Sequence, residues 1–313
     1  MAGPYDKAEF TRRLKTRASE LGFNLCGIAR ARRLEELAPR FRAWLDAGMN
    51  DIMHYLERDP EKRIDPSALL PDARSLVVTG LSYYSRIMQK DPDAPLLSRY
   101  TYGTDYHDVI KGKLNNLLSW IEKNIPEVSG KIVVDSSSMT EKAWAREAGL
   151  GWQGRNSLII NKDIGSFFFI GILILNIDLT FDDPFEKDHC GECRICQDKC
   201  PTGAINGDKT IDARKCIANL TIERRGPVPE NLVRFLGRRV YGCDLCQEVC
   251  PWNESPEVAG TPEFEIDEEI AVMTAEGWKK LSEEQFARLF RRTAMKRVSY
   301  EKMMSNIEAV MKS

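Results

Sequence analysis

Apolar residues in the first 180 positions of the chain follow two different spacings. Three segments, at 6–22, 105–124 and 139–148, repeat an apolar residue every three to four positions, which predicts amphipathic helices. Short, largely apolar runs predict buried strands at 76–81, 131–134, 158–161 and 167–177. Because helices and strands mix along this part of the chain, we expect a catalytic domain of the α+β (mixed α/β) class over residues 1–180.

The pattern changes after residue 182. Closely spaced cysteines, turns and short helical segments continue to Pro251, and the tail offers room for a few short helices only. The 313 residues are also about twice the length of a typical domain of about 150 residues. We therefore predict a second, small domain at 181–255 and a helical C-terminal segment at 256–313.

Composition predicts a globular protein without a membrane span. The chain is 42% hydrophobic and 29% charged, and its longest apolar run, at 167–175, is too short to cross a bilayer. The first 20 residues are charged and contain no apolar core of a signal peptide. We expect a cytoplasmic protein with no membrane partner.

The net charge of −2 hides two basic segments. Residues 214–239 contain seven basic and two acidic side chains, and residues 288–302 contain six basic and one acidic. Solvated helix faces and contacts with nucleic acid both explain such segments, and their sequence alone leaves the two explanations open.

Eight cysteines carry the clearest chemical signal. A C-x2-C-x2-C-x3-C-P run begins at Cys190 and matches the bacterial ferredoxin motif, in which the fourth cysteine ligates the second cluster. A C-x2-C-x3-C-P run begins at Cys243 and is one cysteine short, with Val240 at the missing position. Cys216 is the nearby unassigned cysteine, and we predict that it replaces the missing ligand. The predicted [4Fe–4S] ligand sets are Cys190, Cys193, Cys196 and Cys250 for the first cluster, and Cys200, Cys216, Cys243 and Cys246 for the second.

Disulfides and structural zinc are the alternatives for these cysteines. An even number of cysteines suits a disulfide framework only in a secreted chain. Zinc needs two C-x2-C pairs, so the third cysteine at x2 spacing and the following x3-C-P would be superfluous. The spacing therefore favours iron–sulfur clusters, and the ninth cysteine, Cys26, is expected in the core.

Two weaker signals are set aside. A G-x-G-x-x-G sequence begins at Gly149, but a dinucleotide site requires this motif after a strand and before a helix, and here the predicted order is reversed. The three histidines, His54, His107 and His189, are scattered, and structural roles are predicted for them.

Asp135 follows the strand predicted at 131–134. A carboxyl group there can face a cleft and protonate a leaving oxygen, provided that its surroundings raise its pKa. The alternative is structural, because Ser138-x-x-Glu141 has the form of a capping box and an aspartate before it can order the turn.

A set of motifs in fixed order resembles the epoxyqueuosine reductases over about residues 5 to 300. The motifs are Tyr55-x-x-Arg58, Ser98-Arg99-Tyr100-x-x-Gly103-x-Asp105-Tyr106-His107, Val134-Asp135, Gly149-x-Gly151-Trp152-x-Gly154-x-Asn156, the two cysteine runs, Cys216-Ile217 with Glu223, and Gly242-Cys243-Asp244-x-Cys246-Gln247-x-x-Cys250-Pro251-Trp252-Asn253.

This resemblance implies a cobalamin-dependent reductase that converts epoxyqueuosine at the wobble position of tRNA to queuosine. Its fold would be a cobalamin-binding domain similar to that of reductive dehalogenases, with a ferredoxin-like domain that binds two [4Fe–4S] clusters. An external donor, whose identity the sequence does not give, would supply electrons through the clusters to cobalamin. We expect a monomer that binds the anticodon arm of tRNA.

The resemblance also implies residue roles. Asp135 looks like the proton donor and a cobalamin contact, and the other implied cobalamin contacts are Arg58, Asn156, Ser157, Ala218 and Asp244. The implied tRNA-binding residues are Glu223, Arg224, Arg225, Gly226, Lys280, Arg292, Lys296 and Arg297.

The chain departs from the family where Ala218 and Asn219 replace the usual serine and tyrosine. Neither side chain can donate a hydroxyl group to the cofactor, but the backbone at these positions can still contact it. Two other functions stay open from the residues alone: a corrinoid iron–sulfur reductase of a small substrate, and a ferredoxin-like electron carrier.

Overall fold

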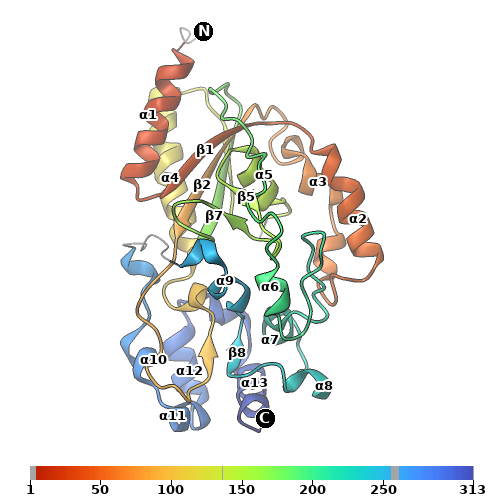
Figure 1. The fold of residues 1–313 in the computed structure, drawn as a ribbon. Coiled ribbons are helices and arrows are strands. Elements are labelled where there is room, and N and C mark those ends of the chain that lie inside the picture. Colours follow the sequence, from red (N-terminus) through yellow and green to blue (C-terminus); the bar gives the residue numbers. More distant parts are fainter. Residues whose placement is uncertain (1–4, 136, 255–260, 313) are drawn as a thin grey trace.

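The computed structural model describes residues 5–135, 137–254 and 261–312. A four-stranded antiparallel sheet with the strand order β1-β2-β7-β4 forms one end of the molecule (Figure 1). Its strands are β1 (Leu25–Arg30), β2 (Ser75–Ser82), β7 (Phe168–Leu175) and β4 (Gly130–Val133).

The two central strands are buried on both faces. β2 and β7 pair over eight residues, from Ser75 opposite Leu175 to Ser82 opposite Phe168, and every residue of β2 is buried. Side chains alternate along a strand, so Val77 contributes to one hydrophobic core and Val78 to the other. Because both faces need apolar side chains, these strands appear in the sequence as nearly uninterrupted apolar runs.

Helices cover both faces of the sheet. On one face lie α1 (Lys7–Glu20) and α4 (Tyr106–Asn124), which bury Leu14, Leu114 and Leu117. The other face buries Trp144 of α5 (Glu141–Glu147). The remaining elements of this part are α2 (Ala38–Asp46), α3 (Pro60–Ile64), β5 (Trp152–Gln153) and β6 (Ile159–Ile160). The three predicted helices and four predicted strands are confirmed, and their ends differ by a few residues.

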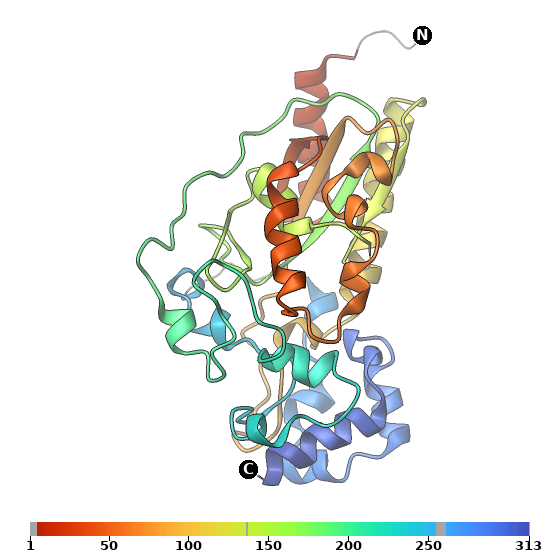
Figure 2. The same ribbon diagram turned by 90° about the vertical axis from the view of Figure 1, so that its right-hand side faces the viewer.

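The cysteine-rich segment and the C-terminal helices form the opposite end of the molecule (Figures 1 and 2). The short helices of the cysteine-rich segment are α6 (Ile195–Asp198), α7 (Ile217–Ile222), α8 (Glu230–Val233) and α9 (Leu245–Glu248). The C-terminal helices are α10 (Glu268–Val272), α11 (Ala275–Lys279), α12 (Glu283–Phe290) and α13 (Tyr300–Lys312).

These parts are joined by a small parallel ladder. β3 (Leu96–Leu97), from the segment after β2, pairs with β8 (Arg239–Tyr241). Leu97 and Tyr241 share a hydrophobic core with Trp278 of α11. Residues 94–102 therefore pack with the C-terminal helices, although they lie inside the predicted first domain. The predicted boundaries at 180 and 255 stay predictions, and residue 255 lies outside the described residues.

No helix within the described ranges is both long enough and apolar enough to cross a membrane.

Close packing of α5 against β1 requires glycine at position 27. A Cβ atom on Gly27 would lie 2.0 Å from the carbonyl oxygen of Ala148 and 2.7 Å from Cδ1 of Leu150. We expect Gly27→Ala to lower the free energy of unfolding by about 1–3 kcal/mol, the usual cost of overpacking, measured by thermal denaturation. The control is Gly112→Ala on α4, where a Cβ meets nothing within 4 Å and should stabilise by about 0.5–1 kcal/mol. Equal stability of Gly27→Ala and the unchanged protein would contradict the packing argument.

Candidate active site and iron–sulfur centre

Asp135 stands two residues after the end of β4 and has an unusual backbone conformation. Its φ of +44° lies in the left-handed region, which aspartate tolerates better than most residues. Its backbone N–H donates a short hydrogen bond to Oε1 of Glu141. Glu141 thus turns back to the aspartate. The alternative of a capping box at Ser138 and Glu141 is wrong, because Thr140 is the N-cap of α5 and makes no side-chain cap.

Two side chains from the start of α4 hold the carboxylate of Asp135. Tyr106 donates its hydroxyl to Oδ2 at 2.8 Å, and Nε2 of His107 lies 3.2 Å from the same oxygen. Burial raises the pKa of Asp135, but the hydrogen bonds from His107 and Tyr106 outweigh burial, so the pKa lies below its usual value. The predicted proton donor is therefore ionised in this arrangement near neutral pH, and its pKa is not raised as the sequence-based hypothesis required.

His107 itself lies between two carboxylates. Nδ1 is 2.7 Å from Oδ1 of Asp105, whose side chain is 3% exposed and also caps α4. Burial opposes the charged imidazolium, but the bonds to Asp105 and Asp135 prevail and raise the pKa of His107 to about 9. The purely structural role predicted for His107 is incomplete, since its ring contacts the candidate catalytic carboxylate. The adjoining Asp105-Tyr106-His107 motif was the available sequence signal.

Glu141 is a second group near Asp135 that holds a proton at neutral pH. Burial, and next the negative charge of Asp135, together raise the pKa of Glu141 to about 8. Sequence reasoning missed this group, because a glutamate in the first turn of a helix is common and gives no functional signal.

A cavity of about 920 Å³ opens beside this network. Tyr55 and Arg58 line one side of it, and residues 224–226 line another. Burial raises the pKa of Tyr55, Glu223 raises it further and Arg297 lowers it, and Asp135 also raises it, so these groups lie within electrostatic reach of one another. Tyr55 therefore lines the same cavity as the predicted tRNA-binding turn and lies within electrostatic reach of the predicted proton donor.

The turn at 223–226 is held from the C-terminal segment. Arg297 pairs with Glu223 at 2.8 Å. Lys302 of α13 is buried and donates to the carbonyl oxygens of Gly226 and Leu220, each at 2.9 Å. The conformation of this turn thus depends on the packing of α13.

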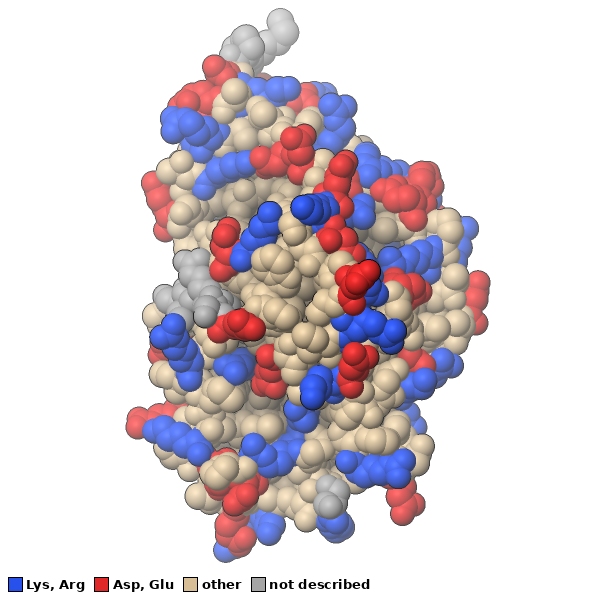
Figure 3. Space-filling model, in the orientation of Figure 1, with Lys and Arg blue, Asp and Glu red and all other residues tan. Residues whose placement is uncertain are grey.

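The other predicted tRNA-binding residues lie in different surroundings. Lys280 pairs with Glu276 at 3.0 Å, Lys296 pairs with Asp105 at 2.9 Å, and Arg292 is exposed. Figure 3 shows basic and acidic side chains side by side over the face that it draws. The basic segment at 288–302 is thus partly neutralised by acidic neighbours, and its role in binding tRNA stays a prediction.

The eight clustered cysteines gather in two groups, and all nine cysteines are free of disulfides. Burial, and next its neighbours Cys190, Cys250 and Cys193, together raise the pKa of Cys196 to about 11. These four also line one small cavity. The cysteines that lie together here are those of the first predicted set, and their role as cluster ligands stays a prediction.

The second group lies deeper. Burial raises the pKa of Cys246, and Cys243 and Cys216 raise it further, while Cys216 is itself influenced by Cys200. Cys196 of the first group also acts on Cys246, so the two groups are adjacent. Iron would supply the positive charge that deprotonates these thiols.

No three His, Cys, Asp or Glu side chains in the described part of the chain converge on a single metal ion. A [4Fe–4S] cube makes no such demand, because each of its four irons takes its own thiolate. The absence of a single-ion site among the described residues therefore does not bear on the two predicted clusters.

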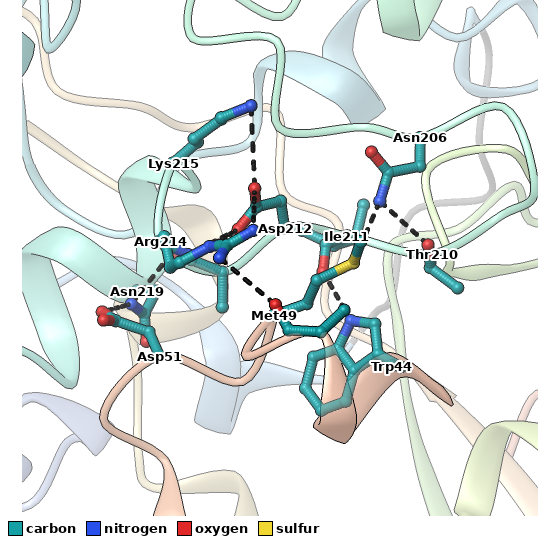
Figure 4. Close-up of polar contacts among 12 residues, drawn as sticks. Trp44, Met49, Asp51, Asn206, Thr210, Ile211, Asp212, Arg214, Lys215 and Asn219 are labelled. Atoms are coloured by element: carbon teal, nitrogen blue, oxygen red, sulfur yellow. Dashed lines mark hydrogen bonds and ion pairs between the residues drawn. The ribbon is translucent and has the colours of Figure 1, made fainter. Parts of the chain in front are cut away.

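Cys216 is brought to its group by a loop packed against α2 (Figure 4). Trp44 donates its indole N–H to the carbonyl oxygen of Ile211 at 2.8 Å. The backbone N–H of Cys216 donates to the carbonyl oxygen of Asp212. Asn219 donates to Asp51 Oδ2 at 2.8 Å. These contacts fix a cysteine that lies 27 positions before Cys243 in the chain.

The predicted cobalamin contacts are distributed around the second cysteine group. Asn156 donates to the carbonyl oxygen of Cys246 at 3.3 Å, Ser157 has a φ of +64°, and Ala218 lies in α7 beyond Cys216. The carboxylate of Asp244 instead accepts from Ser98 and from the backbone N–H of Arg99, and its backbone carbonyl accepts from the N–H groups of Gln247 and Glu248.

One observation fits a corrinoid at this position. Oδ1 of Asn219 is buried and has no hydrogen-bond partner within the described residues. A corrinoid carries amide side chains, whose N–H groups are suitable donors for such an oxygen. The buried oxygen of Asn219 is therefore compatible with the implied cofactor.

Comparisons with known proteins match both halves of this site. Residues 63–136 match the family model "Epoxyqueuosine reductase QueG, DUF1730", and residues 189–253 match the "4Fe-4S double cluster binding domain". The epoxyqueuosine reductase of Cellulophaga algicola is 41% identical over 295 residues, which cover 94% of this chain and 96% of that protein. This chain belongs to the epoxyqueuosine reductase family.

Other members of the family agree over the same length. The epoxyqueuosine reductase of Escherichia coli is 35% identical over 98% of this chain and 82% of its own. A crystal structure of epoxyqueuosine reductase with an epoxyqueuosine-modified tRNA-Tyr stem loop superposes with a TM-score of 0.90 at 30% identity, covering 97% of this chain and 81% of that chain. The predicted family is thereby confirmed.

More distant structures confirm the predicted fold. The catabolic reductive dehalogenase NpRdhA superposes with a TM-score of 0.51 at 17% identity, over 86% of this chain and 36% of that chain. The epoxyqueuosine reductase family thus shares its architecture with a reductive dehalogenase, and the double-cluster domain confirms two [4Fe–4S] clusters.

The ligand role of Cys216 is testable by metal content. We expect Cys216→Ala to retain about four of eight irons after anaerobic reconstitution, because one cube loses a ligand while the other keeps all four. Iron is measured per chain, together with the visible absorbance of the clusters. Cys26→Ala is the matched control and should keep about eight irons. A Cys216→Ala protein with full iron content would refute the assignment.

Proposed function

We propose that this enzyme reduces epoxyqueuosine in the anticodon loop of tRNA to queuosine. The main support is that Tyr55 lines one cavity with the basic turn at 224–226 and lies within electrostatic reach of Asp135, in a chain of the epoxyqueuosine reductase family. A group that can pass on a proton and a cationic rim are what oxygen removal from a polyanionic substrate requires.

The substrate is a nucleotide displaced from the anticodon loop. A solved epoxyqueuosine reductase of the same fold binds an epoxyqueuosine-modified stem loop, which supports tRNA as the partner of this chain. Enzymes that act on a base draw it out of the stack into a pocket. The cavity beside Tyr55 and Arg58 is wide enough for one nucleotide, and Arg224 and Arg225 can face its phosphates.

Asp135 carries the proton to the leaving oxygen. Tyr106 and His107 fix its carboxylate, and Glu141 fixes its backbone, so the reactive oxygen atoms have a defined direction. Such positioning lowers the entropic cost of proton transfer.

When bound, cobalamin and the two clusters supply the electrons for the reduction. Arg58, Asp135, Asn156, Ser157, Ala218 and Asp244 are the proposed cobalamin contacts, and the two cysteine groups would hold the clusters. Cys193 is exposed, which supports the proposal that an external electron donor docks at the first cysteine group.

We propose the cytoplasm as the place of action, because its reducing conditions suit nine unpaired cysteines and tRNA is found there. The monomeric state and the identity of the donor stay predictions from the sequence.

The decisive test is an anaerobic assay with protein reconstituted with iron, sulfide and cobalamin. We expect conversion of epoxyqueuosine in a tRNA stem loop to queuosine, measured by nucleoside chromatography after digestion. Lack of conversion by protein that contains both cofactors would overturn the proposal. Equal turnover of the free nucleoside would favour a small-substrate reductase.

Removal of the acid at Asp135 tests its role. Asp135→Asn should keep eight irons and bound cobalamin, while the single-turnover rate falls by about two to four orders of magnitude, the usual contribution of a general acid. Iron, cobalt and rate are measured on the same preparation. A normal rate would make Asp135 structural.

The exposed Arg225 tests the cationic rim. Arg225→Ala should weaken stem-loop binding and reduce the slope of log K against log salt by about one unit for the lost phosphate contact. Arg12→Ala is the matched control, since Arg12 is exposed on α1 at the other end of the molecule (Figure 1). Equal salt slopes for Arg225→Ala and the unchanged enzyme would exclude the contact.

A further inference from the structure

The charges around Asp135 raise the question of where its proton comes from. Asp135 is ionised in this arrangement, as its lowered pKa indicates, and an ionised carboxylate has no proton to give. A second group must therefore store the proton and pass it to Asp135 when the oxygen leaves.

His107 is the neighbour with the required geometry. Nε2 lies 3.2 Å from Oδ2 of Asp135, within reach of direct transfer. The opposite nitrogen, Nδ1, is 2.7 Å from Asp105. The ring of Tyr106 stacks on the imidazole with centroids 4.1 Å apart, so the ring has a fixed plane.

Asp105 is built to hold the imidazole in its charged form. Its side chain is almost fully buried, it accepts from the backbone N–H of His107 at 3.0 Å, and its other oxygen pairs with Lys296. Burial raises the pKa of Asp105, but the hydrogen bonds from His107 and Lys296 outweigh burial and hold it well below its usual value. The anion is thus permanent over the working pH range.

We propose that His107, held by Asp105, stores the proton that Asp135 delivers to the leaving oxygen of the substrate. This inference rests on the proposed function. Asp135 remains the catalytic residue, because it faces the reacting atoms, while His107 and Asp105 act through it as positioning residues.

The proton balance of the reaction is consistent with this arrangement. Removal of the epoxide oxygen breaks two C–O bonds, forms one C=C bond and releases water, at the expense of two electrons and two protons. The first proton moves from Nε2 of His107 to Asp135 and on to the oxygen, which leaves a neutral imidazole. Solvent then protonates the imidazole again, and the same route delivers the second proton.

Other charged groups near the pair shape its titration. Asp105 and Asp135 face His107 directly, and the groups that act on those two carboxylates are Lys296, Arg297, Tyr106, Glu141 and Lys142. The two carboxylates favour the charged imidazole, and the pKa of His107 of about 9 means that the proton is stored below pH 9 and lost above it. The rate should therefore fall as the pH rises through about 9.

The test combines a direct titration with a pH–rate profile of holoenzyme at saturating stem loop. The chain has three histidines, so NMR of histidine-labelled protein resolves each, and His107→Gln identifies the signal that titrates near pH 9. Asp105→Asn removes the anion but keeps a good N-cap for α4, so it should fold.

In Asp105→Asn we expect the pKa of His107 to fall toward about 6.5, the ordinary histidine value. The fall in rate at alkaline pH should shift to lower pH together with this pKa. The rate should therefore drop about tenfold or more at pH 8 and recover at pH 6. His107→Gln should lower the rate at every pH and remove the fall in rate at alkaline pH. Asp108→Asn is the control, since Asp108 is exposed and contacts Lys296 but not His107.

Titration of His107 near pH 6.5 in the unchanged enzyme would overturn the inference, as would an identical profile for Asp105→Asn. Failure of the proposed function is distinguishable from this, because it leaves the NMR titration near pH 9 intact while no stem loop is converted.

Discussion

The position of β7 between β2 and β4 is the constraint on which the active site depends. Val133 of β4 lies opposite Ile172 of β7. This register fixes the end of β4 and thereby the position of Asp135 two residues later. On the neighbouring face, Gly171 allows Ile110 of α4 to approach, because a Cβ there would lie 2.5 Å from Cγ2 of Ile110. β7 therefore determines the position of the Asp135 carboxylate and of α4, which carries Tyr106 and His107. A slip by one residue would turn every side chain of β4 to the other face.

β7 also supplies an aromatic ring against which Tyr106 packs. Tyr106 stacks on Phe169 of β7, with ring centroids 4.2 Å apart and nearly parallel planes. The hydroxyl that reaches Asp135 is thus held by a ring buried against the sheet, and it does not depend on a mobile loop. From the other side, the C-terminal segment reaches the same network through Lys296, and the rim of the cavity through Arg297. The site is therefore completed by residues from α4, from the segment after β4 and from the C-terminal segment.

Periodicity was enough to predict α1, α4, α5 and the buried strands, because burial leaves an apolar signature in the sequence, whereas the 13-residue α13 was not predicted from it. Spacing was enough to group the cysteines, since short loops limit which thiolates can share a cube. Glu141 and the Asn219–Asp51 contact could not be predicted in this way. Each depends on side chains that meet only after the sheet and the cysteine-rich segment have packed, and Asn219 replaces the tyrosine that the family pattern led us to expect.

The two cysteine groups differ in exposure and in their charged neighbours. Cys193 is exposed, whereas Cys216 and Cys246 are partly buried and act on Lys142 of α5. Asp135 and Glu141 act on the same lysine, and burial lowers its pKa. Lys142 thus interacts with the inner cysteine group and with the carboxyl groups of Asp135 and Glu141. Its charge therefore couples the electrostatics of the predicted cluster ligands to that of the proposed proton donor.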